Sequence, residues 1–186
     1  MNTRDAINEM LLALNELPLE IEDAVEDVPI AIIVNAQLEI TKKKILSKGW
    51  WFNTIAMELV PNTEKYIIVP QTFLSIEGVS NSNVAVRDWK LFDKAELSYK
   101  FDDSVECNVI EDISFDDIPF VVYNYIVQSA TLTSYINIIG NTDDIALRRE
   151  EKNEARIEAI REDSIKSKGN VLSDAYTITT LDRASK

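Results

Sequence analysis

The N-terminal third of the chain has the three- and four-residue spacing of apolar positions that is typical of amphipathic helices. The first such stretch predicts a helix from Thr3 to about Leu17, with Thr3 as its N-cap and Pro18 preventing its continuation. Its apolar positions are Ala6, Met10, Leu14 and Leu17. Residues 19–27 are rich in acidic residues and predict a loop.

A second helix is predicted between Pro29, which suits a first helical turn, and Gly49, which suits a helix end. The residues expected on its buried face are Ile30, Ile33, Val34, Gln37, Thr41 and Ile45. Four lysines crowd its C-terminal end, where the helix dipole favours cations: Lys42, Lys43, Lys44 and Lys48. We expect these lysines to form a solvated helix end, with a contact to DNA or to a neighbouring subunit as the alternative.

From Trp50 to Ile113 the apolar period changes to two, which predicts strands. Residues 56–60 and 66–69 flank a turn at 61–64 and predict one hairpin. Residues 73–79 and 84–86 flank a second turn signal. Residues 90–92 and 106–110 continue the alternation. The sequence therefore predicts a small, mainly antiparallel β subdomain.

Helical spacing returns at Pro119 and is predicted to end at Gly140. The apolar face is wide, and its central members are Val122, Ile126, Ala130, Thr133 and Asn137. A last helix, from Asp143 to about Lys168, is highly charged, with thin apolar content: Ile145, Ala155, Ala159 and Ile160. Such a helix either buries little or packs against another subunit.

The predicted fold class is therefore α+β, with a helical bundle formed by the N- and C-terminal helices and a β subdomain inserted between them. The expected parts are 1–49 with 119–169 for the bundle, 50–118 for the β subdomain and 170–186 for an extended C-terminal tail. Trp50, Phe52 and Ile126 are expected to be mostly buried, because large side chains beside a helix end usually belong to the core.

The amino-acid composition excludes several classes of function. The chain of 186 residues carries 32 acidic and 19 basic residues, a formal net charge of −13, which disfavours tight binding to nucleic acid. It has no histidine and one cysteine, which excludes a Ser-His-Asp triad, a histidine base and an intrachain disulfide. Cys107 is expected to be a buried strand thiol with a raised pKa. No signal peptide or bilayer-spanning segment is visible, so we expect a soluble protein made in a cytoplasm.

Paired carboxylates are the only candidate catalytic or metal-binding groups, at Asp102-Asp103, Glu111-Asp112 and Asp116-Asp117. Neighbouring acids in a strand point to opposite faces, and no calcium-loop or phosphate-loop spacing accompanies them. We therefore interpret them as solvated turns and strand ends, and predict no catalytic residue, metal or cofactor. Asp116 and Asp117 also suit a helix start.

A series of short motifs occurs along nearly the whole chain in the same order as in one known family. The motifs are Leu11–Leu14, Ile45–Trp50, Phe52-Asn53, Ile68–Pro70, Val86-Arg87 through Asp93, Phe115–Pro119, Tyr125–Val127 with Ala130, Glu154-Ala155 and Asn170–Leu172. This order resembles the tail tubular protein A family, the head-to-tail adaptors of podoviruses. The chain departs from the family at Asp88-Trp89, where small residues or glycine are usual.

The resemblance implies a structural virion protein at the head-tail junction, forming a dodecameric ring between the capsid portal and the tail nozzle, a tubular protein B-like partner. It implies that genomic DNA crosses the lumen without specific binding, and that the C-terminal tail embraces the portal. Its large apolar residues are the predicted portal-binding residues: Leu172, Tyr176, Ile178 and Leu181. The composition alone leaves open a second class of function. In this class the chain is an acidic protein that mimics DNA and fills the nucleic-acid-binding site of a partner protein.

Overall fold

The fold is α+β, as predicted, in a computed structural model that describes residues 2–79, 83–140 and 143–171. The chain divides into two compact units. One is helical and comprises Met1–Thr41 with Phe115–Lys186, and the other is Lys42–Ser114 and contains every described strand. Helix α2, Pro29–Leu46, begins in the first unit and ends in the second.

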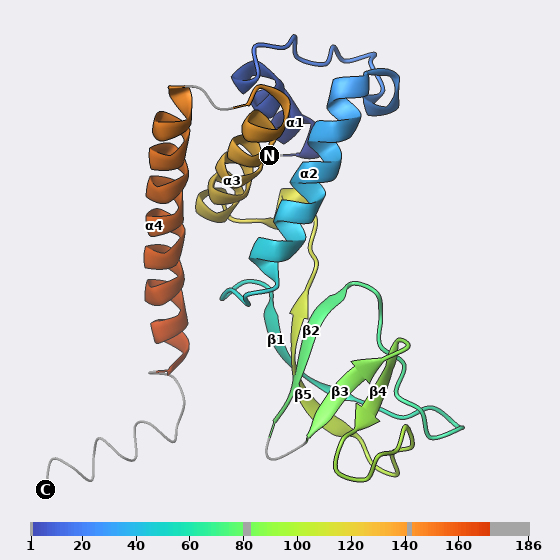
Figure 1. Ribbon diagram of the computed structural model, residues 1–186. Helices are drawn as coiled ribbons and strands as arrows, with labels where there is room; N and C mark the ends of the chain where they lie inside the picture. The colour runs from blue at the N-terminus through green and yellow to red at the C-terminus, as the bar shows by residue number, and fades with distance from the viewer. Residues whose placement is uncertain (1, 80–82, 141–142, 172–186) are drawn as a thin grey trace, which may run out of the picture. The chain divides into compact units, whose positions relative to one another are not determined.

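The helical unit also contains α1 at Thr3–Ala13, α3 at Phe120–Ile138 and α4 at Asp144–Val171 (Figure 1). Two short 3-10 helices, η1 at Val25–Asp27 and η2 at Phe115–Asp117, precede α2 and α3. Helix α3 is the central element, since ten of its 19 residues are buried, Ile126 among them. Figure 1 shows α2 and α4 running in the same direction along the unit.

Helix α1 is shorter than its apolar spacing predicts, and its N-cap is not Thr3. Asn2 caps it: the Asn2 side chain accepts a hydrogen bond from the Asp5 amide, while the Asp5 carboxylate accepts one from the Asn2 amide. At the other end Asn15 adopts a left-handed conformation with φ of 61°. The amides of Asn15 and Glu16 then donate to the carbonyls of Leu12 and Leu11, at 3.1 and 2.9 Å, a Schellman motif that ends the helix before Pro18. Leu17 is consequently exposed.

Helix α2 buries a different face from the predicted one. Val34, Thr41 and Ile45 are buried as expected, but Ala31 and Leu38 complete the buried stripe, while Ile33 is 55% exposed. The helix contains apolar residues around most of its circumference, so spacing alone could not fix which face packs.

Helix α4 is longer than predicted and continues past Lys168 to Val171. The small or apolar residues Ile145, Ala155 and Ala159 are buried, whereas Ile160 is 44% exposed. Arg148 anchors the first turns: it donates to the Ala13 carbonyl at 3.1 Å and lies over the Tyr135 ring. Tyr135 in turn donates to Asp144 at 3.0 Å.

The strand-containing unit has two antiparallel sheets. The first has the order β1-β5-β2, where β1 is Thr54–Leu59, β2 is Phe73–Gly78 and β5 is Val105–Glu111. The second pairs β3, Val84–Arg87, with β4, Lys90–Asp93. Strand β5 is the central strand of the first sheet because it pairs with β1 on one side and with β2 on the other. Both of these neighbours are far from β5 in sequence.

The predicted hairpin does not form. β1 pairs with β5 instead of with residues 66–69, which make only isolated bridges, Tyr66 to Lys100 and Ile68 to Lys90. β2 also pairs with β5, and β3 pairs with β4. Asn62 closes the turn after β1 locally, since its side-chain oxygen accepts from the amides of Glu64 and Tyr66. The strand positions could be read from local alternation, but the pairing depends on which faces meet in the core.

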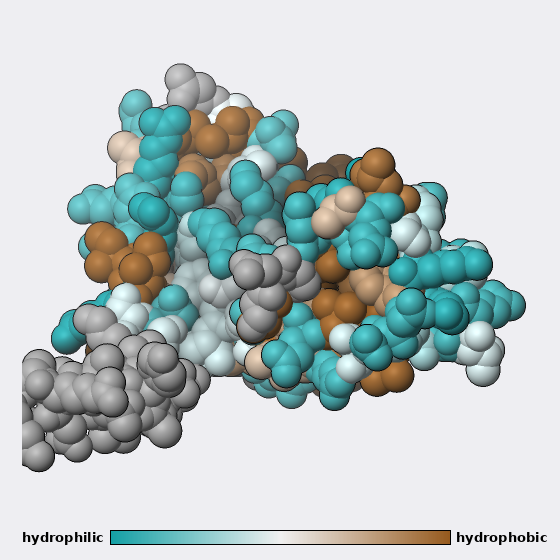
Figure 2. Space-filling model, turned by 90° about the horizontal axis from the view of Figure 1, so that it is seen from below, coloured by the Kyte–Doolittle hydropathy of each residue, from teal (hydrophilic) through white to brown (hydrophobic). Residues whose placement is uncertain are grey.

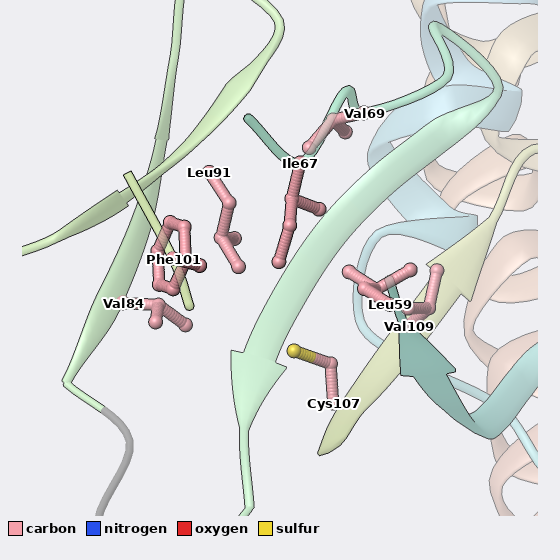
Figure 3. Packing of buried hydrophobic residues seen from close by; sticks show 8 residues of the cluster. All are labelled: Leu59, Ile67, Val69, Val84, Leu91, Phe101, Cys107 and Val109. Atoms are coloured by element: carbon pink, nitrogen blue, oxygen red, sulfur yellow. The ribbon is translucent and has the colours of Figure 1, made fainter. Parts of the chain in front are cut away.

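The core of this unit joins side chains from both sheets and from the segments between them (Figure 3). Its buried members are Leu59, Ile67, Val69, Val84, Leu91, Phe101, Cys107 and Val109. Cys107 is 1% exposed, as predicted, and burial raises the pKa of its thiol.

The hairpin between β3 and β4 turns through Asp88 and Trp89, which both have positive φ, 49° and 58°. Two left-handed residues in a two-residue loop are characteristic of a type I′ turn, which favours Asn and Gly. Most residues with a Cβ are strained in this region, so this turn carries a conformational cost.

Substitutions at the exposed Asp88 should change stability in opposite directions according to backbone preference alone. Asp88→Gly should raise the free energy of unfolding by about 0.5–1 kcal/mol, because glycine adopts positive φ freely. Asp88→Ala should lower the free energy of unfolding by a similar amount, because alanine lacks the short polar side chain that helps aspartate to adopt positive φ. Urea denaturation of both variants measures this, and two shifts of the same sign would contradict the turn geometry.

Candidate functional site

The most connected polar side chain in the described part of the strand-containing unit is Asn53, which is fully buried between the end of α2 and the start of β1. Its side-chain oxygen accepts from the Trp50 amide at 2.8 Å. Its side-chain nitrogen donates to the carbonyls of Leu46 and Glu111, at 3.2 and 2.9 Å. The Asn53 carbonyl accepts from the Glu111 amide at 2.9 Å. One amide group thus joins the last turn of α2, the loop after it and the end of β5.

The residues around Asn53 support the same junction. Gly49 has φ of 74°, and a Cβ there would lie 3.1 Å from both Ile110 Cδ1 and Thr54 Oγ1, so glycine is needed for conformation and for space. Trp50 is 5% exposed and its indole nitrogen donates to the Ile45 carbonyl at 2.8 Å. Phe52 stacks on Trp50 and is partly buried, less than predicted.

The lysine cluster is not uniformly solvated, and for Lys42 the prediction is wrong. Lys42 is 7% exposed, and its ammonium lies 3.2 Å from the Asp112 carboxylate and 3.4 Å from the Ile113 carbonyl. Lys43 lies at 4.0 Å from the other oxygen of Asp112, with its side chain mostly exposed. Lys44 and Lys48 are exposed, as predicted. The Glu111-Asp112 pair therefore belongs to the helix-to-strand junction.

The other two acidic pairs, Asp102-Asp103 and Asp116-Asp117, lie at the surface. Asp102 is exposed and paired with Lys65, whose hydrogen bond lowers the pKa of the Asp102 carboxyl. Asp116 and Asp117 lie exposed in η2. Within residues 2–79, 83–140 and 143–171, no three His, Cys, Asp or Glu side chains gather as a metal site would require.

Asn53 should be the most sensitive polar residue of the junction. Asn53→Ala should lower the free energy of unfolding by about 2–4 kcal/mol, because it leaves several buried backbone groups without partners. Asn53→Asp should lower the free energy of unfolding further at neutral pH, because a carboxylate oxygen would face the two carbonyls to which the amide nitrogen now donates. Asn108→Asp, at an exposed position of β5, is the matched control for the same chemical change.

Denaturant midpoints and m-values of the three variants test this. If Asn53→Asp lowers the free energy of unfolding no more than Asn108→Asp does, the Asn53 amide does not stabilise the junction as its hydrogen bonds indicate.

Apolar side chains on two helices of this fold remain at the surface. On α2 they are Ile32, Ile33 and Ile40, of which Ile40 is 63% exposed, and on α4 they include Ile157, Ile160 and Ile165, of which Ile157 is 65% exposed. Figure 2 shows one face of the molecule, where separate brown apolar patches interrupt a mostly teal, polar surface. A contiguous apolar patch, in contrast to single apolar side chains, marks a contact surface.

The predicted portal-binding residues Leu172, Tyr176, Ile178 and Leu181 lie outside the described residues. None of the helices within the described ranges is both long and apolar enough to cross a membrane. Sequence reasoning missed Asn53 as the centre of the junction, because a single asparagine has no periodicity; the only signal was its place beside Phe52 in one of the family-like motifs.

The described residues combine a helical unit, a small unit of antiparallel strands and exposed isoleucines on two helices. Comparison with known proteins gives the class: residues 4–169 match the family model described as tail tubular protein, so the chain belongs to the tail tubular protein family. It is thus a structural protein of a bacteriophage tail and a component of the virion.

A curated relative supports the family assignment. The chain is 29% identical over 163 residues to tail tubular protein A of Klebsiella phage KP34, an alignment that covers 87% of each protein. The relationship therefore extends over both units and most of α4.

Proposed function

We propose that the protein is the subunit of a dodecameric adaptor ring at the head-tail junction of a podovirus, where it joins the capsid portal to the short tail. The ring would also contact the tail nozzle and form part of the channel for genome ejection. Support comes from family membership over residues 4–169 and from the ordered motifs, which resemble head-to-tail adaptors in particular.

The observation that carries the proposal is the exposure of isoleucines on α2 and α4. Both helices already bury one face within the subunit, yet each exposes isoleucines on the side away from its buried residues. A ring subunit needs two such surfaces, because a cyclic assembly uses one surface to contact the next copy and another to receive the previous copy.

The charge of the chain fits a channel through which DNA slides. A formal charge of −13 on every copy opposes adhesion of phosphates, so DNA would pass without being held. A DNA mimic would also be acidic, but the acids of α4 alternate with Arg149, Arg156 and Arg161, which interrupts any phosphate-like array. The proposal requires no cofactor, metal or catalytic residue.

The C-terminal tail is proposed as the portal clasp. Residues 172–186 contain Leu172, Tyr176, Ile178 and Leu181, and large apolar residues are unusual in a terminus that binds nothing. Tyr176 and Ile178 alternate with threonines, a pattern that suits a strand added to a partner sheet.

Binding to purified portal rings tests the function and the clasp together. The full chain should co-sediment with portal, and the resulting complex should then bind the nozzle protein. Deletion of residues 171–186 should leave the thermal midpoint nearly unchanged and reduce portal binding at least tenfold. Replacing Leu172 and Tyr176 with Ser should act in the same direction, with Leu97→Ser, at an exposed position of the other unit, as control.

A full chain that binds neither portal nor nozzle would refute the adaptor function. A truncated chain that binds portal normally would refute only the clasp.

A further inference from the structure

The exposed isoleucines of α2 and α4 follow the spacing of helices that pack side by side. On the outer face of α2, defined by Ile33, Ala36, Ile40 and Lys43, the steps are three, four and three residues. On the outer face of α4, defined by Asn153, Ile157, Ile160 and Ser164, the steps are four, three and four. Alternating steps of three and four place residues in one line along a helix, as in coiled coils.

The two faces also complement each other in size. Ile33, Ile40 and Ile157 are each more than half exposed, at 55%, 63% and 65%, while Ala36, Asn153 and Ser164 are small or short polar residues beside them. Large residues of one helix can therefore insert beside small residues of the other.

Ring symmetry fixes the relative direction of such a pair. α2 and α4 run the same way within the helical unit (Figure 1). A cyclic ring of twelve rotates each copy by only a small angle relative to its neighbour, so α2 of one copy and α4 of the next must also be nearly parallel. Antiparallel packing of the same faces would instead produce a two-fold dimer.

Two parallel registers keep the steps of three and four in phase, and the residues distinguish them. One sets Ile40 beside Ile157, but it also sets Ile33 beside Glu150 and brings Lys44 next to Arg156. The other sets Ile33 beside Ile157, Ala36 beside Ile160 and Ile40 beside Ser164. In that second register Lys44 lies next to Asp163, an opposite charge at the edge of the contact.

We infer that the outer face of α2 receives the outer face of α4 from a second copy of this chain, in parallel, with Ile33 against Ile157 and Lys44 beside Asp163. This inference rests on the proposed ring, and names the surfaces through which its subunits join. The occupant is a second copy because apolar spacing, residue size and charge all match between two faces of the same chain.

Disulfide trapping in portal-bound assemblies tests the pairing. The background is low, because Cys107, the only cysteine, is 1% exposed. A mixture of chains carrying Ala36→Cys and chains carrying Ile160→Cys should form a cross-linked pair on mild oxidation, and each variant alone should not. Chains with Leu97→Cys, an exposed residue of the other unit, mixed with Ile160→Cys chains give the collision control.

A mixture of Ile33→Cys and Ile160→Cys chains distinguishes the direction, because these positions meet only in the antiparallel arrangement. Cross-linking of that mixture in place of the first would overturn the parallel pairing. A ring that forms on the portal without cross-linking in either mixture would overturn the surfaces while leaving the adaptor function intact. Cross-linking of the first mixture in free protein that never binds portal would support the surfaces and refute the function.

Charge exchange provides a second readout that needs no cysteine. Lys44→Glu and Asp163→Lys should each weaken association by about threefold per contact, as expected for an exposed ion pair. The double variant should recover most of that loss, and circular dichroism should show unchanged helix content in all three. Failure of the double variant to recover association would contradict the register.

Discussion

The buried amide of Asn53 is the interaction on which the strand-containing unit depends most. Its side chain makes three hydrogen bonds to backbone groups, at the end of α2, in the following loop and at the end of β5. Removal of any partner would leave a buried polar group unpaired, which is costly. Gly49 permits the sharp turn, and Lys42 with Asp112 closes the junction on another side. The register of β5 is thereby set at one end, and β1 and β2 pair on either side of it.

A junction with this many internal hydrogen bonds fits the structural role that membership of the tail tubular protein family gives the chain. Asp102 and Asp112 pair with lysines, and the single thiol is buried with a raised pKa, which disfavours the reactive thiolate. What the fold offers to other molecules is surface: isoleucines on α2 and α4, and a charge that repels DNA. Membership of the tail tubular protein family gives those surfaces a context, and the proposed ring gives each of them a partner.

Local patterns in the sequence predicted the element types well because helices and strands have distinct periods. The face of α2 was not predictable, since its isoleucines occur all around the helix and tertiary packing chooses among them. The strand pairing was not predictable either, because β5 joins β1 and β2 from a distant part of the chain. The end of α1 was missed because Asn15, not Pro18, stops it through a left-handed cap. Asn53 and Lys42 show the same limit: their roles come from partners that no local pattern specifies.

The central claim is that this chain acts as a ring subunit between portal and tail, and direct imaging tests it best. Cryo-electron microscopy of the intact tail should show twelve copies in one ring below the portal, each with its α2 outer face covered by α4 of the neighbouring copy. A reconstruction in which this chain lies elsewhere in the virion, or in which α2 faces solvent within a complete ring, would contradict the account.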